Sequence, residues 1–262
     1  MHNPLLVNNI YEKISLIEEV CHNLLVGELH LEVPLIPGRE FKMVAAREIP
    51  NKKGLSYREG QGQMLHDLAS IELQAMELGL RTLADFPEAP LLFREQLVQI
   101  IIEESQHLKL CLKGLEQLGY RWGDWPAHVQ LWASTSSEDD LLDRILIVHR
   151  YLEGSGLDAS SILLKRLSSV DCPPLEKAIH KIAEDEESHV EFGSYWFQKN
   201  CKIKKLDSDF EFKTRFKKVL PRLPKRFERI NFELRKKVGF TDVELQVLSN
   251  VREEWVESFK SK

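Results

Sequence analysis

The sequence predicts an all-α protein built around a four-helix bundle, and three observations support this fold class. Apolar residues recur at helical spacing along four long runs, at about 58–85, 90–118, 138–168 and 174–200. Prolines lie between these runs or at their starts, where a helix tolerates them. The second and fourth runs each contain Glu-x-x-His, a spacing that places an acid and an imidazole on one helix face.

Length and composition indicate an ordinary globular protein. The 262 residues are enough to bury a sizeable core, with 43% hydrophobic residues, 29% charged residues and a net charge of −5. The four cysteines are scattered and form no Cys-x-x-Cys pair, so a reducing, cytoplasmic location fits best. We expect no signal peptide and no membrane span, because the N-terminus lacks a basic region and no uninterrupted apolar stretch is long enough to cross a bilayer. The oligomeric state stays open.

Residues 1–57 are expected to form a helix followed by an extended arm. Residues 4–27 carry apolar side chains at helical spacing, and Gly27 is a natural helix end. Residues 28–57 hold several prolines and glycines without a sustained period or a hairpin signal. This segment therefore reads as an arm that wraps the body.

The bundle follows in residues 58–200. A proline turn near residue 88 joins the first two long helices, and Gly119 ends the second. Residues 119–137, with three tryptophans, are too long for a tight turn and read as a packed crossover. Ser137 and Asp140 resemble a capping signal for the third helix, and a second proline turn leads into the fourth.

Residues 201–262 are expected to form a basic helical extension packed on the bundle, with helices at about 208–219, 224–237 and 241–259. Residues 199–237 hold 15 Lys/Arg and 5 Asp/Glu. Most charge runs are solvated helix faces, and the interleaved acids and phenylalanines fit that interpretation. The alternative is a footprint for RNA or another polyanion, although no nucleic-acid motif accompanies it.

The two Glu-x-x-His stretches, Glu104/His107 and Glu186/His189, each have a lone glutamate about one helix length earlier. These are Glu72 and Glu153, and the interval from Glu72 to Glu104 nearly equals the interval from Glu153 to Glu186. Within each predicted hairpin the two glutamates are nearly equidistant from the turn, about 24 Å along the helices. Both glutamate pairs are therefore expected to meet in mid-bundle.

Four carboxylates and two imidazoles at one height predict a binuclear metal site, because two divalent ions balance four negative charges. The arrangement is that of ferritin-like di-iron and di-manganese carboxylate proteins. Such ligands suit two iron ions, or manganese and iron, and the lack of cysteine ligands argues against structural zinc. The expected ligands are Glu72, Glu104, His107, Glu153, Glu186 and His189, and the similarity to those proteins implies that Glu104 and Glu186 are the bridges. Candidates for a supporting hydrogen bond behind them are His149, Asp158 and His66.

Residues 45–200 also resemble a bacterial family of uncharacterised ferritin-like proteins. The resemblance is carried by Ala-Arg-Glu-Ile-Pro (46–50) and by the stretches at 65–75, 101–107, 151–158 and 184–190. The family pattern Glu-Ala-Arg-Gly-Leu-Asp is Glu153-Gly154-Ser155-Gly156-Leu157-Asp158 here, so its arginine near the site is missing. More distantly, the ligand pattern is similar to tRNA-modifying di-iron hydroxylases, a resemblance that implies an RNA substrate.

Three functions are compatible with these ligands. The first is an oxygen-activating oxidoreductase, a hydroxylase or oxidase that needs an external electron donor because the chain has no Cys-x-x-Cys module. The second is a non-catalytic iron-binding or ferroxidase-type protein. The third is an interaction protein in which the metal only stabilises the helix bundle. The arm, the tryptophan crossover and the C-terminal extension would obstruct packing in a storage cage, which favours the enzyme.

Overall fold

The computed structural model describes residues 2–260, and all regular elements in that range are helices. The chain forms two compact units. Unit 1 contains the chain up to Ala133 together with Leu164–Ile182. Unit 2 contains Ser134–Leu163 together with the chain from Ala183 onward. The predicted division into residues 1–57, 58–200 and 201–262 stays a prediction.

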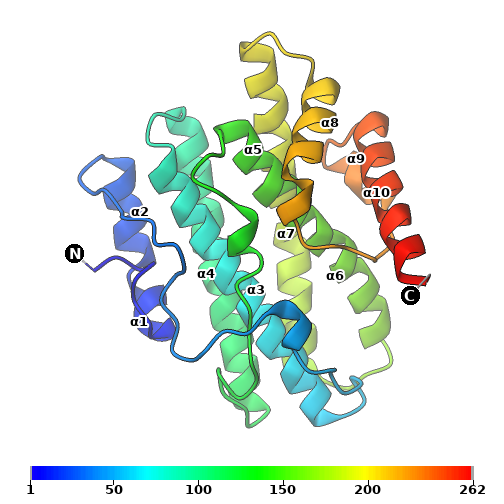
Figure 1. The fold of residues 1–262 in the computed structure, drawn as a ribbon. Helices are drawn as coiled ribbons and strands as arrows, with labels where there is room; N and C mark the ends of the chain where they lie inside the picture. Colours follow the sequence, from blue (N-terminus) through cyan, green and yellow to red (C-terminus); the bar gives the residue numbers. More distant parts are fainter. Residues whose placement is uncertain (1, 261–262) are drawn as a thin grey trace. The chain divides into compact units, whose positions relative to one another are not determined.

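Unit 1 is centred on an antiparallel pair of long helices, α3 (Arg58–Asp85) and α4 (Leu91–Gln117), which lie side by side (Figure 1). Pro90 precedes the first residue of α4. At the end of α4, Gly119 has a φ of +78°, and the Tyr120 N–H bonds back to the Leu115 carbonyl at 3.0 Å. This closure is a common helix end that glycine adopts without strain.

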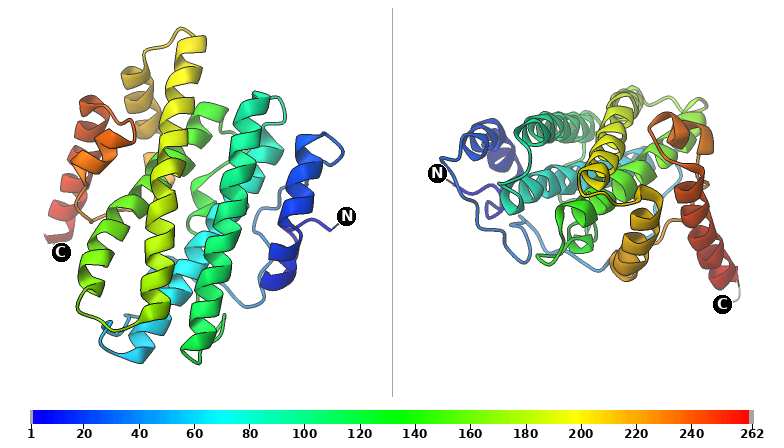
Figure 2. Two further views of the ribbon diagram at one scale, coloured as in Figure 1. Left: turned by 180° about the vertical axis from the view of Figure 1, so that it is seen from behind. Right: turned by 90° about the horizontal axis from the view of Figure 1, so that it is seen from above.

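The N-terminal helix is shorter than expected and is broken. It comprises α1 (Ile10–Ser15) and α2 (Ile17–Leu25), with the break at Leu16. The prediction of one helix over 4–27 is wrong at its start because the Asn9 side chain accepts the Glu12 N–H and caps α1 there. Figure 2 shows these short helices beside α4, and α2 contacts both α3 and α4.

The arm that follows is irregular, as expected, apart from a 3₁₀ turn at Ala46–Glu48. A buried charge cluster attaches it to the helices. Glu77 on α3 is fully buried and pairs with Lys13 on α1 and with Arg39 of the arm, whose two bonds are 2.6 and 2.5 Å long. Lys13 also donates to the Gly38 carbonyl at 3.1 Å. Two cations around one carboxylate compensate the desolvation of all three groups.

Unit 2 contains α5 (Leu141–Ile145), a π-helical segment (Leu146–Leu152) and most of α6 (Glu153–Leu167), which together cover the expected third helix. The cap of α5 is Asp140, whose carboxylate accepts the Asp143 N–H at 2.9 Å, so the prediction of Ser137 as cap is wrong. Helix α7 (Pro173–Ile203) continues slightly beyond its expected end, and its part from Ala183 belongs to unit 2.

The C-terminal elements of unit 2 are α8 (Ser208–Val219), a 3₁₀ turn (Leu220–Arg222), α9 (Phe232–Lys237) and α10 (Asp242–Lys260). The helix predicted at 224–237 forms only in its last part, as α9. Its first half is irregular because other elements bind its backbone: the Tyr151 hydroxyl donates to the Pro224 carbonyl, and Arg252 donates to the Phe227 and Glu228 carbonyls. Tertiary hydrogen bonds thus replace helical ones.

No helix within residues 2–260 has a stretch long and apolar enough to span a bilayer.

Candidate metal centre

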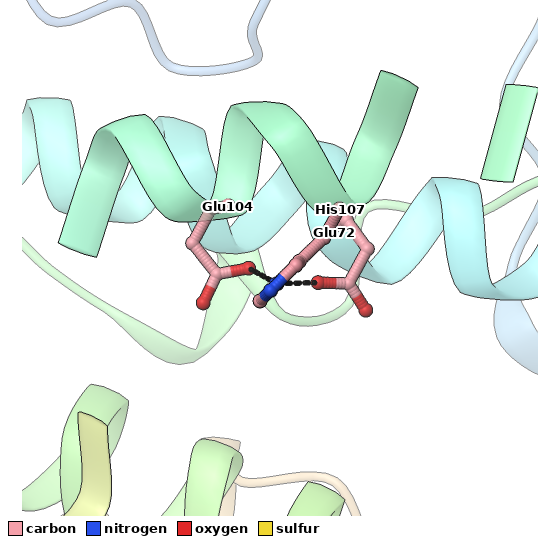
Figure 3. Close-up of side chains that lie close together, drawn as sticks. All are labelled: Glu72, Glu104 and His107. Atoms are coloured by element: carbon pink, nitrogen blue, oxygen red, sulfur yellow. Dashed lines mark hydrogen bonds and ion pairs between the residues drawn. The ribbon is translucent and has the colours of Figure 1, made fainter. Parts of the chain in front are cut away.

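In unit 1, the predicted ligands Glu72, Glu104 and His107 converge (Figure 3). Glu72 projects from α3, and the other two lie one turn apart on α4. The ring nitrogen Nδ1 of His107 lies 3.4 Å from a carboxylate oxygen of each glutamate. All three side chains are at most 2% exposed. The i, i+3 spacing therefore places the Glu104 carboxylate and the His107 ring on the same face of α4.

These distances fit three donors around one metal ion. They are long for N–H···O hydrogen bonds, whose usual range is 2.7–3.2 Å, although they remain within hydrogen-bonding reach. Two ligands bound at about 2.1 Å to a tetrahedral or octahedral ion lie about 3.0–3.4 Å apart. Carboxylate and imidazole donors suit iron and manganese, so the residues present fit the group that the sequence implies.

Without an ion, the same cluster must hold protons. Burial raises the pKa of the Glu72 carboxyl to about 8, and the negative charge of Glu104 adds to this shift. Burial alone would lower the pKa of His107, but hydrogen bonds and charges from Glu104 and Glu72 raise it to about 11. At neutral pH, Glu72 is therefore largely protonated and His107 is a cation.

Metal binding at these residues is expected to release protons and to strengthen with pH. Both raised pKa values mean that metal-binding forms are scarce below pH 8, so an ion must displace protons. For each proton displaced, the affinity should rise about tenfold per pH unit. Co(II) titrations between pH 6 and 8, in buffers of different ionisation enthalpy, measure this effect. Glu72→Gln should flatten the slope, and a pH-independent affinity in the unaltered protein would contradict the assignment.

In unit 2, Glu153 opens α6, and Glu186 and His189 lie on α7. A Glu153 carboxylate oxygen and a His189 ring nitrogen are within 4.8 Å of one another. The Glu186 carboxylate lies against the bare backbone of Gly156, where an added Cβ would stand 3.2 Å from Oε1. All three ligands are at most 7% exposed. The second set of predicted ligands therefore also lies in a buried part of its unit.

Two of the predicted supporting residues, His149 and Asp158, lie beside this second set. The His149 Nδ1 is 2.9 Å from the Glu153 carboxylate, so these two side chains are hydrogen-bonded, while the role of Glu153 as a metal ligand stays a prediction. Asp158 instead binds Arg235 on α9, at 2.8 Å from Nη2 and 3.2 Å from Nε. Sequence reasoning missed Arg235. A cation does lie near the site, but it comes from α9, far along the chain, rather than from position 155.

His66 has a different role from the predicted one. Its Nε2 accepts the Gly123 N–H at 3.1 Å, and its ring stacks on Trp122 with centroids 4.6 Å apart. Burial lowers the pKa of His66 to about 4, so the ring is neutral. These contacts attach the tryptophan crossover to α3, in agreement with the packed crossover that the sequence predicts. None of the contacts described for His66 is a hydrogen bond to one of the predicted metal ligands.

The basic segment 199–237 forms many internal ion pairs in unit 2. Arg215 binds Asp140 and Asp143, each at 2.7 Å, and Lys218 binds Asp143 at 2.6 Å. Further pairs link this segment to other acids: Arg222 to Asp139, Arg235 to Asp158, Lys236 to Asp242 and Lys237 to Glu187. These contacts agree with ordinary amphipathic helices, and RNA binding stays a prediction.

Comparisons with known proteins extend over most of the chain. Residues 6–246 match the family described as "Protein of unknown function (DUF455)". An uncharacterized protein of Haemophilus influenzae is 30% identical over 219 residues, which cover 80% of this chain and 75% of that relative. No solved structure matches. Since the family match spans nearly the whole sequence, the chain belongs to the DUF455 family of proteins of unknown function.

Proposed function

We propose that this protein is a binuclear metal carboxylate protein of the di-iron type, with a ferritin-like bundle formed by α3, α4, the π segment with α6, and α7. The observation that carries the proposal is the convergence of Glu72, Glu104 and His107 in a buried site with metal-compatible spacing. An acid-rich cluster on an exposed surface would mean little, but two buried carboxylates must either take up protons or bind a cation.

The ligand set of unit 2 supports two ions rather than one. It repeats the composition of unit 1, with two glutamates and one histidine on two helices. Two such sets supply four carboxylates, which balance two divalent ions. In this proposal Glu104 and Glu186 bridge the ions, Glu72 and Glu153 each bind one of them, and each histidine supplies one nitrogen.

Two ferrous ions held this way would supply two electrons to dioxygen and so allow hydroxylation or dehydrogenation of a substrate. The chain's own residues provide the setting. Apolar neighbours of the ligands, such as Leu108 and Val190, are fully buried and exclude water. Glu72 and His107 hold protons that metal binding releases. His149 orients the Glu153 carboxylate through a 2.9 Å hydrogen bond. The proposal includes an external electron donor.

Anaerobic loading with ferrous iron, followed by elemental analysis and oxygen-consumption measurements, tests the proposal. We expect two iron ions per chain and rapid oxygen uptake by the loaded protein. Fewer than one bound iron ion per chain would contradict the proposed binuclear centre. Two ions without oxygen uptake would leave a metal that only stabilises the bundle, and would reject the oxidoreductase. Glu103→Gln, beside a proposed bridge and bonded to Gln99, is the matched control.

A further inference from the structure

The helix that carries Glu153 has an unusual backbone directly before this ligand. In the π segment the Glu153 N–H bonds to the Val148 carbonyl, five positions earlier instead of four. A π-helical turn is less regular than an α-helical one and needs support from its surroundings. The direction in which the Glu153 side chain points therefore depends on what holds this turn.

Arg235 of α9 lies against this turn and holds it through a hydrogen bond and a close contact. Its Nη1 donates to the Arg150 carbonyl, within the π segment, at 3.0 Å. Its guanidinium lies directly on Gly154, the residue after the ligand, where an added Cβ would stand 1.9 Å from Nη1. Arg235 is 2% exposed. Glycine lowers helix stability, so its presence here fits a need for close approach.

Asp158, five residues beyond Glu153, completes the attachment. One of its carboxylate oxygens accepts both Arg235 bonds, and the other accepts the Asn231 N–H at 2.9 Å. Asn231 is also the cap of α9, since its side chain accepts the Leu234 N–H. A single carboxylate thus binds both the start of α9 and its arginine, which fixes Arg235 against the π segment.

The two glycines of Glu153-Gly154-Ser155-Gly156 serve opposite faces of α6. Gly154 makes room for the Arg235 guanidinium, and Gly156 makes room for the Glu186 carboxylate. The Glu153 carboxylate is hydrogen-bonded to His149, and Arg235 bonds the Arg150 carbonyl three residues before Glu153. The C-terminal extension therefore contributes to the construction of the ligand set in unit 2.

We propose that Arg235 is a positioning residue for the metal ligand Glu153, acting through the π segment and Asp158. The inference rests on the proposed metal centre. It assigns the C-terminal extension a defined task there, which is to fix the direction of one ligand.

Co(II) alone, titrated anaerobically into the full chain and followed by its visible absorption spectrum, is the probe. The first variant combines Arg235→Met with Asp158→Asn, so that no buried charge is left unpaired. We expect one Co(II) equivalent to keep its affinity and the other to weaken about tenfold or more, with shifted absorption bands. Lys236→Met, which removes an exposed cation from the same helix, should match the unaltered protein.

Gly154→Ala is the second variant, and it covers the case in which the first does not fold. Alanine favours a helix more than glycine does, so a merely structural effect would leave metal binding unchanged. Positioning predicts the same weakened equivalent, because the new methyl group displaces the guanidinium. In the Arg235→Met/Asp158→Asn background, Gly154→Ala should cause no further loss.

The outcomes separate the two proposals. If the unaltered protein binds fewer than one Co(II), the metal centre and the role of Arg235 both fail. If it binds two, and the folded variants also bind two with the same affinities and spectrum, only the role of Arg235 is overturned. Selective weakening of one equivalent by both variants supports it.

Discussion

Replacing Glu104 by glutamine is expected to abolish binding of both metal ions. Glutamine keeps the size of the side chain but removes the charge, and an amide is a poor bridge between two cations. In unit 1, Glu104 also supplies one of the two carboxylates within 3.4 Å of His107. Elemental analysis after anaerobic iron loading, together with a Co(II) titration, should show less than a tenth of the metal bound by the unaltered protein.

This loss should not come from unfolding. The charge of Glu104 contributes to the raised pKa of Glu72, so without it Glu72 can lose its proton more easily and pair with His107 in the metal-free protein. The metal-free variant is therefore expected to unfold at the same denaturant concentration as the unaltered protein, or at a higher one. Glu103→Gln is the control for metal content. If the Glu104 variant keeps one ion at full occupancy, Glu104 is a terminal ligand and not a bridge.

The sequence predicts best the parts of the fold that depend on local pattern. Helix α3 runs over the expected residues, 58–85, because its apolar period is sustained and a proline turn follows. The convergence of Glu72 with Glu104 and His107 was predictable too. In a tight hairpin, residues equidistant from the turn reach the same height, and the α3–α4 turn fixes that relation without help from the rest of the chain.

The sequence predicts poorly what depends on distant residues. Nothing in the run 146–152 signals a π turn, and the irregular backbone after Pro224 is held by Tyr151 and Arg252, which are remote in the chain. In the sequence, Arg235 is one of 15 lysines and arginines in the basic segment 199–237. Only its position against Gly154 distinguishes Arg235 from the other cations. In the sequence, the two glycines on either side of Ser155 are the one sign that other groups pack closely against this helix.

Replacing Arg150 by methionine is expected to destabilise the fold by about 3–5 kcal/mol, because it leaves a buried charge without a partner. Arg150 and Glu244 are both fully buried and make two bonds of 2.5 and 2.7 Å. The Arg150 guanidinium also lies against aromatic rings, 4.3 Å from the centroid of Phe240. Urea unfolding followed by circular dichroism measures the change.

Glu244 has a second role, which decides the choice of residue 244 in a double variant with Arg150→Met. Its carboxylate accepts the Thr241 N–H at 2.9 Å, while the Thr241 hydroxyl accepts the Glu244 N–H, which forms a capping box at the start of α10. Glutamine preserves that box and removes only the charge. Arg150→Met/Glu244→Gln should therefore recover most of the lost stability, and Glu244→Gln alone should cost less than Arg150→Met. Equal losses in the Arg150 single variant and the double variant would mean that packing against the rings, rather than the buried charge, carries the energy.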